Sequence, residues 1–586
     1  MPTLEWIGKE KVINHHIDVP YRVLNRVYSY DLNGRHSEDN GSENKIIHGD
    51  NLEALKSLLP EYAGKIKCIY IDPPYNTGNE GWVYNDNVND PKIKKWLGEV
   101  VGKEGEDLSR HDKWLCMMYP RLRLLHKLLA EDGVIFISID NNEMFNLKLL
   151  CDEIFGSNYF VNSISWQRTY SMRNDSKGIP SEVEYILVYS KRADWNPKKL
   201  PRTEELDSKY KNPDNDEKGA WQNTSAFAPG GASHQGMVYA IQHPFTGKML
   251  YPTMDAHWRY SQEAMLEYMN GWTSYCLVDL QDDDERAKVC GLEASAVRKG
   301  VQAIVLEKPL KVAQLEAKEV YERGNWPRFY FTGGGKGGIR RKTYLDKVGG
   351  MPATNLWQFS DVGHTDEAAK TLRAIFNGRA AFDTPKPYRL VERILQIAAD
   401  EDSIILDSFA GSGTTAHAVL NMNKADGGNR KFILIEMEDY ADSITAERVK
   451  RVIHGYGDGK SAVEGTGGDF CFYELGERLM LDNGALNPDM DMQNIRNYIW
   501  YTETKKFLPD MEQDDNQYFL AADGDMAYYF YYEKDAVTTL DRTFLRTIKT
   551  KAESYIIYAD QCAVSDKELQ KHNITFKKIP RDIVSV

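Results

Sequence analysis

The chain has 586 residues, of which 42% are hydrophobic and 27% charged, as is usual for a globular protein with several domains. Its net charge of −14 excludes a surface that is basic overall, so any contact with nucleic acid must depend on local positive charge. The seven scattered cysteines, never spaced as C-x-x-C, exclude a zinc site and a disulfide framework. We expect no metal site.

The first segment, residues 1–44, is polar and mixed and predicts an irregular N-terminal arm. No signal peptide and no apolar run long enough to span a bilayer is visible, which favours a cytoplasmic protein without a membrane partner. The segment over 45–51 predicts a short strand that ends in an acid, Asp50. A helix with leucines at helical spacing and a second strand over 66–71 follow, so this region predicts a βαβ unit.

The second strand ends abruptly at Asp72-Pro73-Pro74-Tyr75. Neither proline can donate a backbone hydrogen bond, and the first favours an extended conformation at Asp72. Asp72 and the Pro73 carbonyl can therefore accept hydrogen bonds from an amino group, while Tyr75 can stack on a planar ring. These residues predict a holder for the exocyclic amine of an aromatic base; the alternative is a strand that ends in a polar turn.

Residues 76–111 form a long insertion, rich in Asn and Gly, which we expect to be a lid or binding loop. A helix from 114, a strand over 133–140 and a helix over 144–155 follow. Two further strands, 161–166 and 183–189, predict an antiparallel edge. Residues 45–190 thus predict one half of a doubly wound, mostly parallel α/β sheet.

The alternation of strands and helices stops between 191 and 350, which predicts an inserted domain of different architecture. Basic residues gather there around the glycine run at 333–338. A flexible glycine loop with Lys and Arg can follow a phosphate backbone closely. The candidates for DNA contact in this cluster are Lys336, Arg340, Arg341 and Lys342; the alternative is a solvated hairpin tip.

Alternation resumes over 351–465, where a strand over 403–407 leads into a glycine-rich turn and a helix. Glycines permit close backbone approach, and the helix N-terminus offers amide donors to a ligand. The next strand ends in Glu436, an acid placed to bind a ribose diol. Because a Walker lysine is missing, the turn predicts a nucleoside cofactor rather than a phosphate site.

The tail, residues 470–586, predicts a small, separate α/β domain with strands over 528–532, 554–558 and 574–579 and helices over 538–548 and 566–570. It contains no catalytic cluster. We expect an interaction or assembly role.

The order of these motifs resembles the permuted, β-class amino DNA methyltransferases, and in finer detail the modification subunits of type III restriction-modification systems. The resemblance covers about 45–455. It depends on residues 50–55, 72–78, 110–114, 120–122, 132–140, 382–387 and 407–415. One departure is Val183, where the family leads us to expect a histidine before Glu184.

The resemblance implies a Rossmann-like methyltransferase fold, S-adenosylmethionine as cofactor and double-stranded DNA as substrate. It assigns cofactor contacts to Asp407, Phe409, Ala410, Gly411, Ser412, Gly413 and Thr414, with Glu436 on the ribose, Asp50 near the adenine edge, and Lys386 and Pro387 beside the methionine end. Asp72, Pro73, Pro74 and Tyr75 would hold the target base, and Asn76 and Thr77 would contact DNA. It also implies a homodimer, residues 191–350 as target-recognition domain and a helicase or nuclease subunit as partner.

The predicted reaction is site-specific methylation of adenine at N6. Methylation of cytosine at N4 stays open because the same holder fits either amine. A second alternative is a DNA-reading subunit that is active only with a partner nuclease. No cysteine lies in a recognisable motif, which argues against methylation at cytosine carbon 5.

Overall fold

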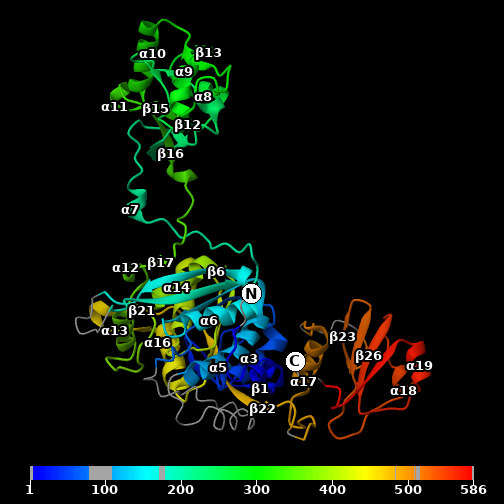
Figure 1. Ribbon diagram of the computed structural model, residues 1–586. Coiled ribbons are helices and arrows are strands. Elements are labelled where there is room, and N and C mark those ends of the chain that lie inside the picture. Colours follow the sequence, from blue (N-terminus) through cyan, green and yellow to red (C-terminus); the bar gives the residue numbers. More distant parts are fainter. Residues whose placement is uncertain are drawn as a thin grey trace. The chain divides into compact units, whose positions relative to one another are not determined.

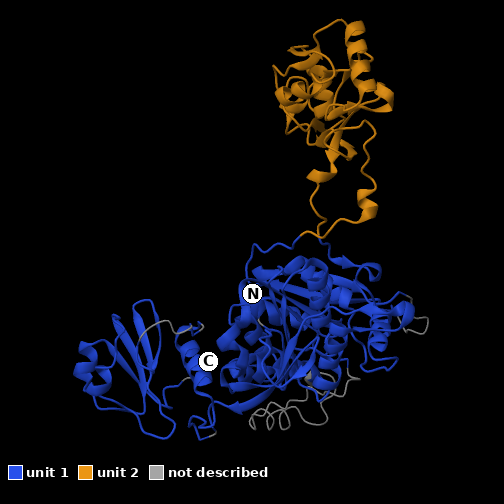
Figure 2. Cartoon of the chain, turned by 180° about the vertical axis from the view of Figure 1, so that it is seen from behind, with its two compact units in different colours: residues 1–198, 353–586 blue, residues 199–352 orange. Residues whose placement is uncertain are grey.

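The computed structural model describes residues 4–77, 108–170, 179–481, 483–506, 508–509 and 515–583. The chain forms two compact units, shown separately in Figure 2: residues 1–198 with 353–586, and residues 199–352. Most of the predicted insertion over 76–111, including Trp82, Tyr84 and Trp96, lies outside the described residues. Within the described ranges, no helix combines the length and apolar composition needed to cross a bilayer.

An 11-stranded sheet forms the centre of the first unit (Figure 1). The strands from β5 to β22 are parallel, while β7 on one side and β1 on the other run antiparallel to them. In spatial order the strands are β17 (Leu356–Trp357), β6 (Phe160–Gln167), β7 (Val183–Ser190), β5 (Leu129–Ile139), β4 (Ile66–Ile71), β18 (Ile404–Asp407), β19 (Lys431–Glu436), β3 (Lys45–His48), β22 (Phe470–Arg478), β1 (Arg22–Asp31) and β2 (Gly34–His36).

Helices pack on the sheet in two layers. Ile69 and Ile71 of β4 share a buried core with side chains of α3 (Asn51–Tyr62) and α5 (Leu108–Leu128). Successive side chains of a strand point to opposite faces, so Tyr70 faces the other layer. There α14 (Tyr388–Ala398) contacts β4 and β5, and α15 (Thr414–Asp426) contacts β19. The predicted doubly wound α/β class and its antiparallel edge, β6 with β7, are confirmed.

The predicted βαβ unit is wrong in one respect: β3 and β4 are parallel but are not neighbours. β18 and β19, from residues more than 300 positions later, lie between them. Strands that are consecutive in sequence are adjacent in most sheets, and here the later half of the chain breaks that rule. As a result, β3 stands on the same side of β4 as the glycine-loop strands.

Two predicted domain limits also need correction, because the sheet extends into both terminal segments. The supposedly irregular arm, residues 1–44, contains β1, a ten-residue strand whose apolar and polar residues alternate only weakly. Residues 470–478, assigned to the tail, form β22 between β3 and β1. Strand β1 of the N-terminal segment and strand β22 of the C-terminal segment therefore both belong to the main sheet.

The tail beyond β22 contains a four-stranded sheet of β23 (Phe519–Asp523), β24 (Met526–Phe530), β26 (Ser554–Ala559) and β28 (Ile574–Lys578). Helix α17 (Met492–Thr504) buries Ile495, Ile499 and Trp500 in the same core as α3, so the tail is not separate from the sheet. The helix predicted over 538–548 is wrong. Its residues instead form the two-residue strand β25 (Thr539–Leu540) and the short helix α18 (Arg542–Leu545).

The unit over 199–352 has its own aromatic core, which includes Trp221, Trp258 and Trp272. It contains a three-stranded sheet of β15 (Phe329–Phe331), β16 (Ile339–Tyr344) and β8 (Trp221–Ser225), and a four-stranded sheet of β11 (Met249–Leu250), β10 (Ile241–Gln242), β14 (Ala303–Leu306) and β13 (Tyr275–Val278). Because these elements bury their own core, the unit is a domain inserted between β7 and β17.

Candidate active site

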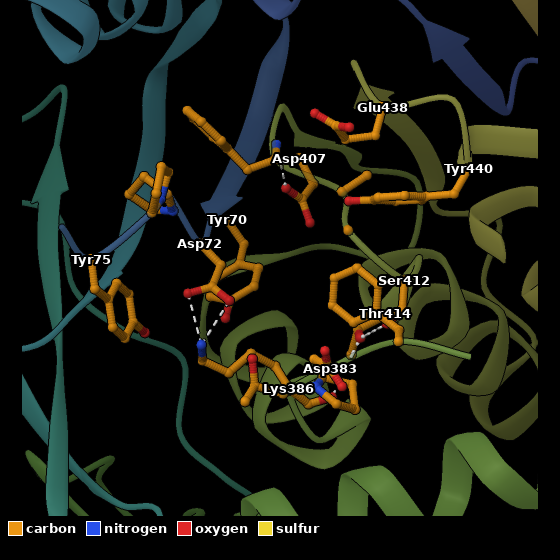
Figure 3. Close-up of a pocket in the computed structure, with 18 residues that line it drawn as sticks. Tyr70, Asp72, Tyr75, Asp383, Lys386, Asp407, Ser412, Thr414, Glu438 and Tyr440 are labelled. Carbon is orange, nitrogen blue, oxygen red and sulfur yellow. Dashed lines mark hydrogen bonds and ion pairs between the residues drawn. The ribbon is translucent and has the colours of Figure 1, made fainter. Parts of the chain in front are cut away.

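A cavity of about 450 Å³ opens at the carboxyl ends of β4 and β18 (Figure 3). These parallel neighbours pair with Leu406 opposite Ile69, so the segments that follow them emerge side by side. The cavity is lined by residues from the Asp72–Tyr75 segment, from 382–386 and from the turn after β18, together with Glu438 and Tyr440. Such a switch point is the usual ligand site of an open α/β sheet.

The carboxylate of Asp72 is held by Lys386. Lys386 Nζ donates to Asp72 Oδ1 at 2.8 Å and to Oδ2 at 2.7 Å. Burial lowers the pKa of Lys386, but attraction to Asp72 and Glu184 outweighs this effect, so the net shift raises the pKa and the ammonium stays charged. Lys386, predicted to lie beside the methionine end of a cofactor, lines the cavity, and its amine reaches the predicted base holder.

The Tyr75 ring is oriented by a second acid, Glu184 on β7. The Tyr75 hydroxyl donates to Glu184 Oε2 at 3.1 Å, and Arg168 donates to the other oxygen at 3.0 Å. Lys386 Nζ lies 4.9 Å from the centre of the Tyr75 ring. On the opposite side of the turn, Trp114 Nε1 donates to the Pro74 carbonyl at 2.7 Å. The turn and its ring are therefore held in place by long-range contacts.

The turn after β18 is organised by Asp407 and two glycines. Asp407 accepts hydrogen bonds from the Phe409 amide at 3.0 Å and from the Thr415 hydroxyl at 2.5 Å. Gly411 and Gly413 have φ angles of +52° and +80°, which L side chains rarely adopt. A Cβ at Gly413 would lie 3.0 Å from the Thr445 carbonyl oxygen. Glycine is thus needed for both conformation and space.

Glu436 stabilises the turn after β18. It is 1% exposed and accepts hydrogen bonds from the Gly411 amide at 2.7 Å and the Glu438 amide at 3.1 Å. Burial raises the pKa of Glu436 to about 7, and burial likewise raises that of Asp407 to about 7. Glu436 itself does not line the cavity, whereas Glu438, two residues further on, does.

These two carboxyl groups predict a dependence of stability on pH. Both hold protons in the folded chain up to about pH 7 and lose them near pH 4 when unfolded, so unfolding releases protons between those values. Stability should therefore fall as the pH rises from about 4 to 7, by on the order of 3–4 kcal/mol for each of the two groups. Thermal unfolding at pH 5, 6, 7 and 8 measures this dependence of stability on pH. The dependence should be flatter in Asp407→Asn, and the same dependence as in the wild type would contradict a raised pKa of Asp407.

Several predicted residues lie outside the cavity lining. The Asp50 carboxylate caps α3 by accepting from the amides of Leu52 and Glu53 at 2.8 and 3.2 Å. Pro387 and Gly413 lie directly beside lining residues. Asn76, predicted to contact DNA, is 0% exposed and donates to Glu143 and to the Arg110 carbonyl, so this prediction is wrong. A buried amide that bonds a buried acid can hold the turn but cannot reach a duplex. Thr77 is half-buried.

The basic cluster of the inserted unit divides into two kinds of residue. Lys336 and Arg340 are exposed and Arg341 is half-buried. Lys342 is 0% exposed and pairs with Asp214 and Asp216 at 2.5 Å each, so its predicted DNA contact is wrong. Strand alternation does not explain the difference, because Arg340 and Lys342 lie two residues apart on β16 and so share a face. Lys342 is buried because Asp214 and Asp216 pair with it.

The sequence analysis missed Glu184, Arg168, Glu438, Tyr440 and Phe382 as site residues. Phe382 lay inside a segment that supported the resemblance, whereas Glu184 adjoins the departure at Val183. Nothing local marks a carboxylate on an antiparallel strand as a neighbour of Tyr75. Among the described residues, no three His, Cys, Asp or Glu side chains are grouped to hold a metal ion.

The chain is similar to subunits of restriction-modification enzymes and to a type II methyltransferase. The chain is 32% identical over 525 residues to the Mod subunit of the type III restriction-modification enzyme StyLTI of Salmonella typhimurium, which covers 84% of this chain and 66% of that protein. It is 30% identical over 453 residues to the EcoPI Mod subunit of Escherichia phage P1, and the match covers 75% of this chain and 64% of that protein. The chain thus spans slightly less than two thirds of these curated relatives.

A third relative is the type II methyltransferase M.KpnI of Klebsiella pneumoniae, 31% identical over 399 residues that cover 67% of this chain and 81% of the relative. A family model described as DNA methylase, for N6 and N4 methyltransferases, matches residues 66–447. This match spans more than half of the chain and includes both strand ends that form the cavity. The chain belongs to this family of DNA methylases.

Proposed function

We propose that this chain transfers a methyl group from S-adenosylmethionine to the N6 amino group of an adenine in duplex DNA. The observation that carries the proposal is the single cavity in which the Asp72–Tyr75 turn, suited to an aromatic amine, faces the glycine turn after β18. Family membership supports the reaction class, and the resemblance to type III modification subunits supports adenine.

The cavity fits the cofactor in size and chemistry. Its volume of about 450 Å³ lies within the range of small-molecule sites. The glycine turn admits close backbone approach, Glu438 suits a ribose diol, and Phe409 and Tyr440 offer apolar surface to an adenine ring. When bound there, S-adenosylmethionine supplies an electrophilic methyl group.

The residues of the Asp72–Tyr75 turn would position the base. An amino group on an aromatic ring is a poor nucleophile, and in a duplex it is also paired and stacked, so the base must be flipped at a cost of a few kcal/mol. The Tyr75 ring would stack on the flipped base, while Asp72 and the Pro73 carbonyl accept its two amino hydrogens. These bonds direct the nitrogen lone pair toward the methyl group, so the catalysis depends on positioning and preorganised charge.

Lys386 shares Asp72 with the proposed substrate. Both oxygens of Asp72 accept from its ammonium, and each carboxylate oxygen can accept one further hydrogen bond from an amino group. Glu184 Oε2 lies 3.7 Å from Lys386 Nζ and offers a second acceptor. Movement of the ammonium toward Glu184 would expose Asp72 without leaving a buried charge unpaired.

The inserted unit is proposed to bind the duplex through its exposed basic residues. Lys336→Ala and Arg340→Ala should each reduce the salt dependence of DNA affinity by about one phosphate contact without loss of folding. Lys342→Met should instead leave two buried carboxylates unpaired and destabilise the unit by about 3–5 kcal/mol. DNA binding at several salt concentrations and thermal unfolding distinguish the two effects; an unchanged salt slope in both surface variants would contradict the assignment.

Methylation of cytosine at N4 is the second candidate, because the matching family model covers both amino positions. Expression in a host that lacks adenine methylation, followed by sequencing that detects modified bases, separates them. N6-methyladenine in one motif would support the proposal, and N4-methylcytosine would support the alternative. An unmodified genome with folded protein that binds cofactor would favour a subunit that needs its partner.

We also propose a restriction subunit as partner, since the relatives StyLTI and EcoPI are named as Mod subunits of restriction-modification enzymes. The homodimer is proposed from the family resemblance alone. Sedimentation of the full chain tests the dimer. A truncation at 470 is unsuitable for locating its interface, because it would remove β22 from the sheet.

A further inference from the structure

A fully buried arginine lies behind the glycine turn. Arg448, on α16 (Glu447–His454), is 2% exposed. Its Nη1 donates to the hydroxyls of Ser412 and Thr414 at 2.8 Å each, and its Nη2 lies 3.2 Å from His417 Nδ1. Burial lowers the pKa of Arg448 to about 10, so it remains charged at neutral pH.

This charge has no acidic partner among the described residues. Lys450 and Arg451 on the same helix pair with Asp442 and Glu447 at 3.1 and 2.7 Å, whereas the bonds of Arg448 end on hydroxyls, an imidazole and a backbone carbonyl. Its Nε is buried without a hydrogen-bond partner. Arg448 also lies at the N-terminus of α15, where the helix dipole already disfavours a cation. An unpaired buried charge is costly, so an anion nearby would be stabilising.

The bonds of Arg448 lead to the cavity. Ser412 and Thr414 both line it, and Figure 3 shows them close together beside the segment that carries Lys386. Each hydroxyl accepts from Arg448 and keeps its own proton. The protein hydrogen bonds open to these protons are long: Thr414 donates to the Lys386 carbonyl at 3.3 Å, and the Ser412 hydroxyl lies 3.4 Å from that of Thr414. A hydroxyl polarised by a guanidinium is a stronger donor, so both are prepared to bind an anion.

We infer that Arg448, through the hydroxyls of Ser412 and Thr414, recognises the carboxylate of the amino-acid end of S-adenosylmethionine. This inference rests on the proposed function and names a residue outside the cavity that selects for one charged group of the cofactor. Lys386 is already committed to Asp72, so Arg448 supplies the unmatched positive charge near this part of the turn. Arg448 is therefore a positioning residue rather than a catalytic one.

The test compares two ligands on the full chain by calorimetry: S-adenosylmethionine and its decarboxylated analogue, which keeps the sulfonium and the amine. The wild type should prefer the intact cofactor by about tenfold or more, as expected for a charged hydrogen bond. Arg448→Met should lose at least about tenfold in affinity for the intact cofactor and less than about twofold for the analogue. Arg448→Lys should keep part of the preference.

The matched control is Arg451→Met, three residues after Arg448 on α16. Arg451 bonds Glu447 and the Ile375 carbonyl. This substitution should leave the preference unchanged. If Arg448→Met loses equal affinity for both ligands, Arg448 has only a structural role, which would overturn this inference but not the proposed function. If Arg448→Met does not fold, the same comparison is made with Arg448→Lys. A wild type that binds neither ligand would overturn the proposed cofactor as well.

Discussion

Replacing Asp72 with alanine is expected to reduce methyl transfer by on the order of a thousandfold, because the variant loses the acceptor that orients the target amine. Cofactor affinity should change little, since the glycine turn is held by Asp407, Glu436 and Thr445 rather than by Asp72. The measurements are single-turnover methylation of duplex DNA and calorimetric binding of S-adenosylmethionine.

The control for this variant is Asp140→Ala. Asp140 follows the neighbouring strand β5, and its carboxylate accepts only from Asn142 at 2.9 and 2.7 Å among the bonds described. This substitution removes an acid of the same type from the same sheet edge and should leave the rate unchanged. Full activity of Asp72→Ala would refute the proposed role of the turn. Loss of both activity and cofactor binding would indicate a structural effect instead.

Gly413→Ala is expected to weaken cofactor binding by about tenfold to a hundredfold, because displacement of a binding segment by less than 1 Å has effects of that size. The new Cβ would lie 3.0 Å from the Thr445 carbonyl oxygen at a φ of +80°. Backbone oxygen cannot withdraw as a flexible side chain can, so the turn itself must move. Strain in the left-handed region also lowers stability by about 1–2 kcal/mol.

The matched control is Gly427→Ala at the other end of α15. Gly427 also has a positive φ, +74°, but a Cβ there would meet nothing within 4 Å. Both variants should lose similar stability from backbone strain, and only Gly413→Ala should lose cofactor affinity. Equal dissociation constants for the two variants would show that the turn after β18 does not contact the ligand.

Much of the fold could be predicted because it follows from local constraints. The prolines after Asp72 end a strand wherever that strand lies in the sheet, and the glycines after Asp407 permit only a tight turn. The antiparallel edge also follows from local alternation and a short connection. Where alternation was weak, prediction failed: β1 was expected to be irregular, and residues 538–548 were expected to be helical.

The sequence by itself thus determined the two cavity-forming motifs, the α/β class and the inserted unit, because propensity and turn chemistry act over a few residues. Only the tertiary structure decided which motifs meet. It places β18 between β4 and β19, Lys386 on Asp72 across 314 positions, and Lys342 inside its unit rather than on the surface. The physical reason is that strand order, ion pairing and burial depend on contacts between distant segments, which no local pattern specifies.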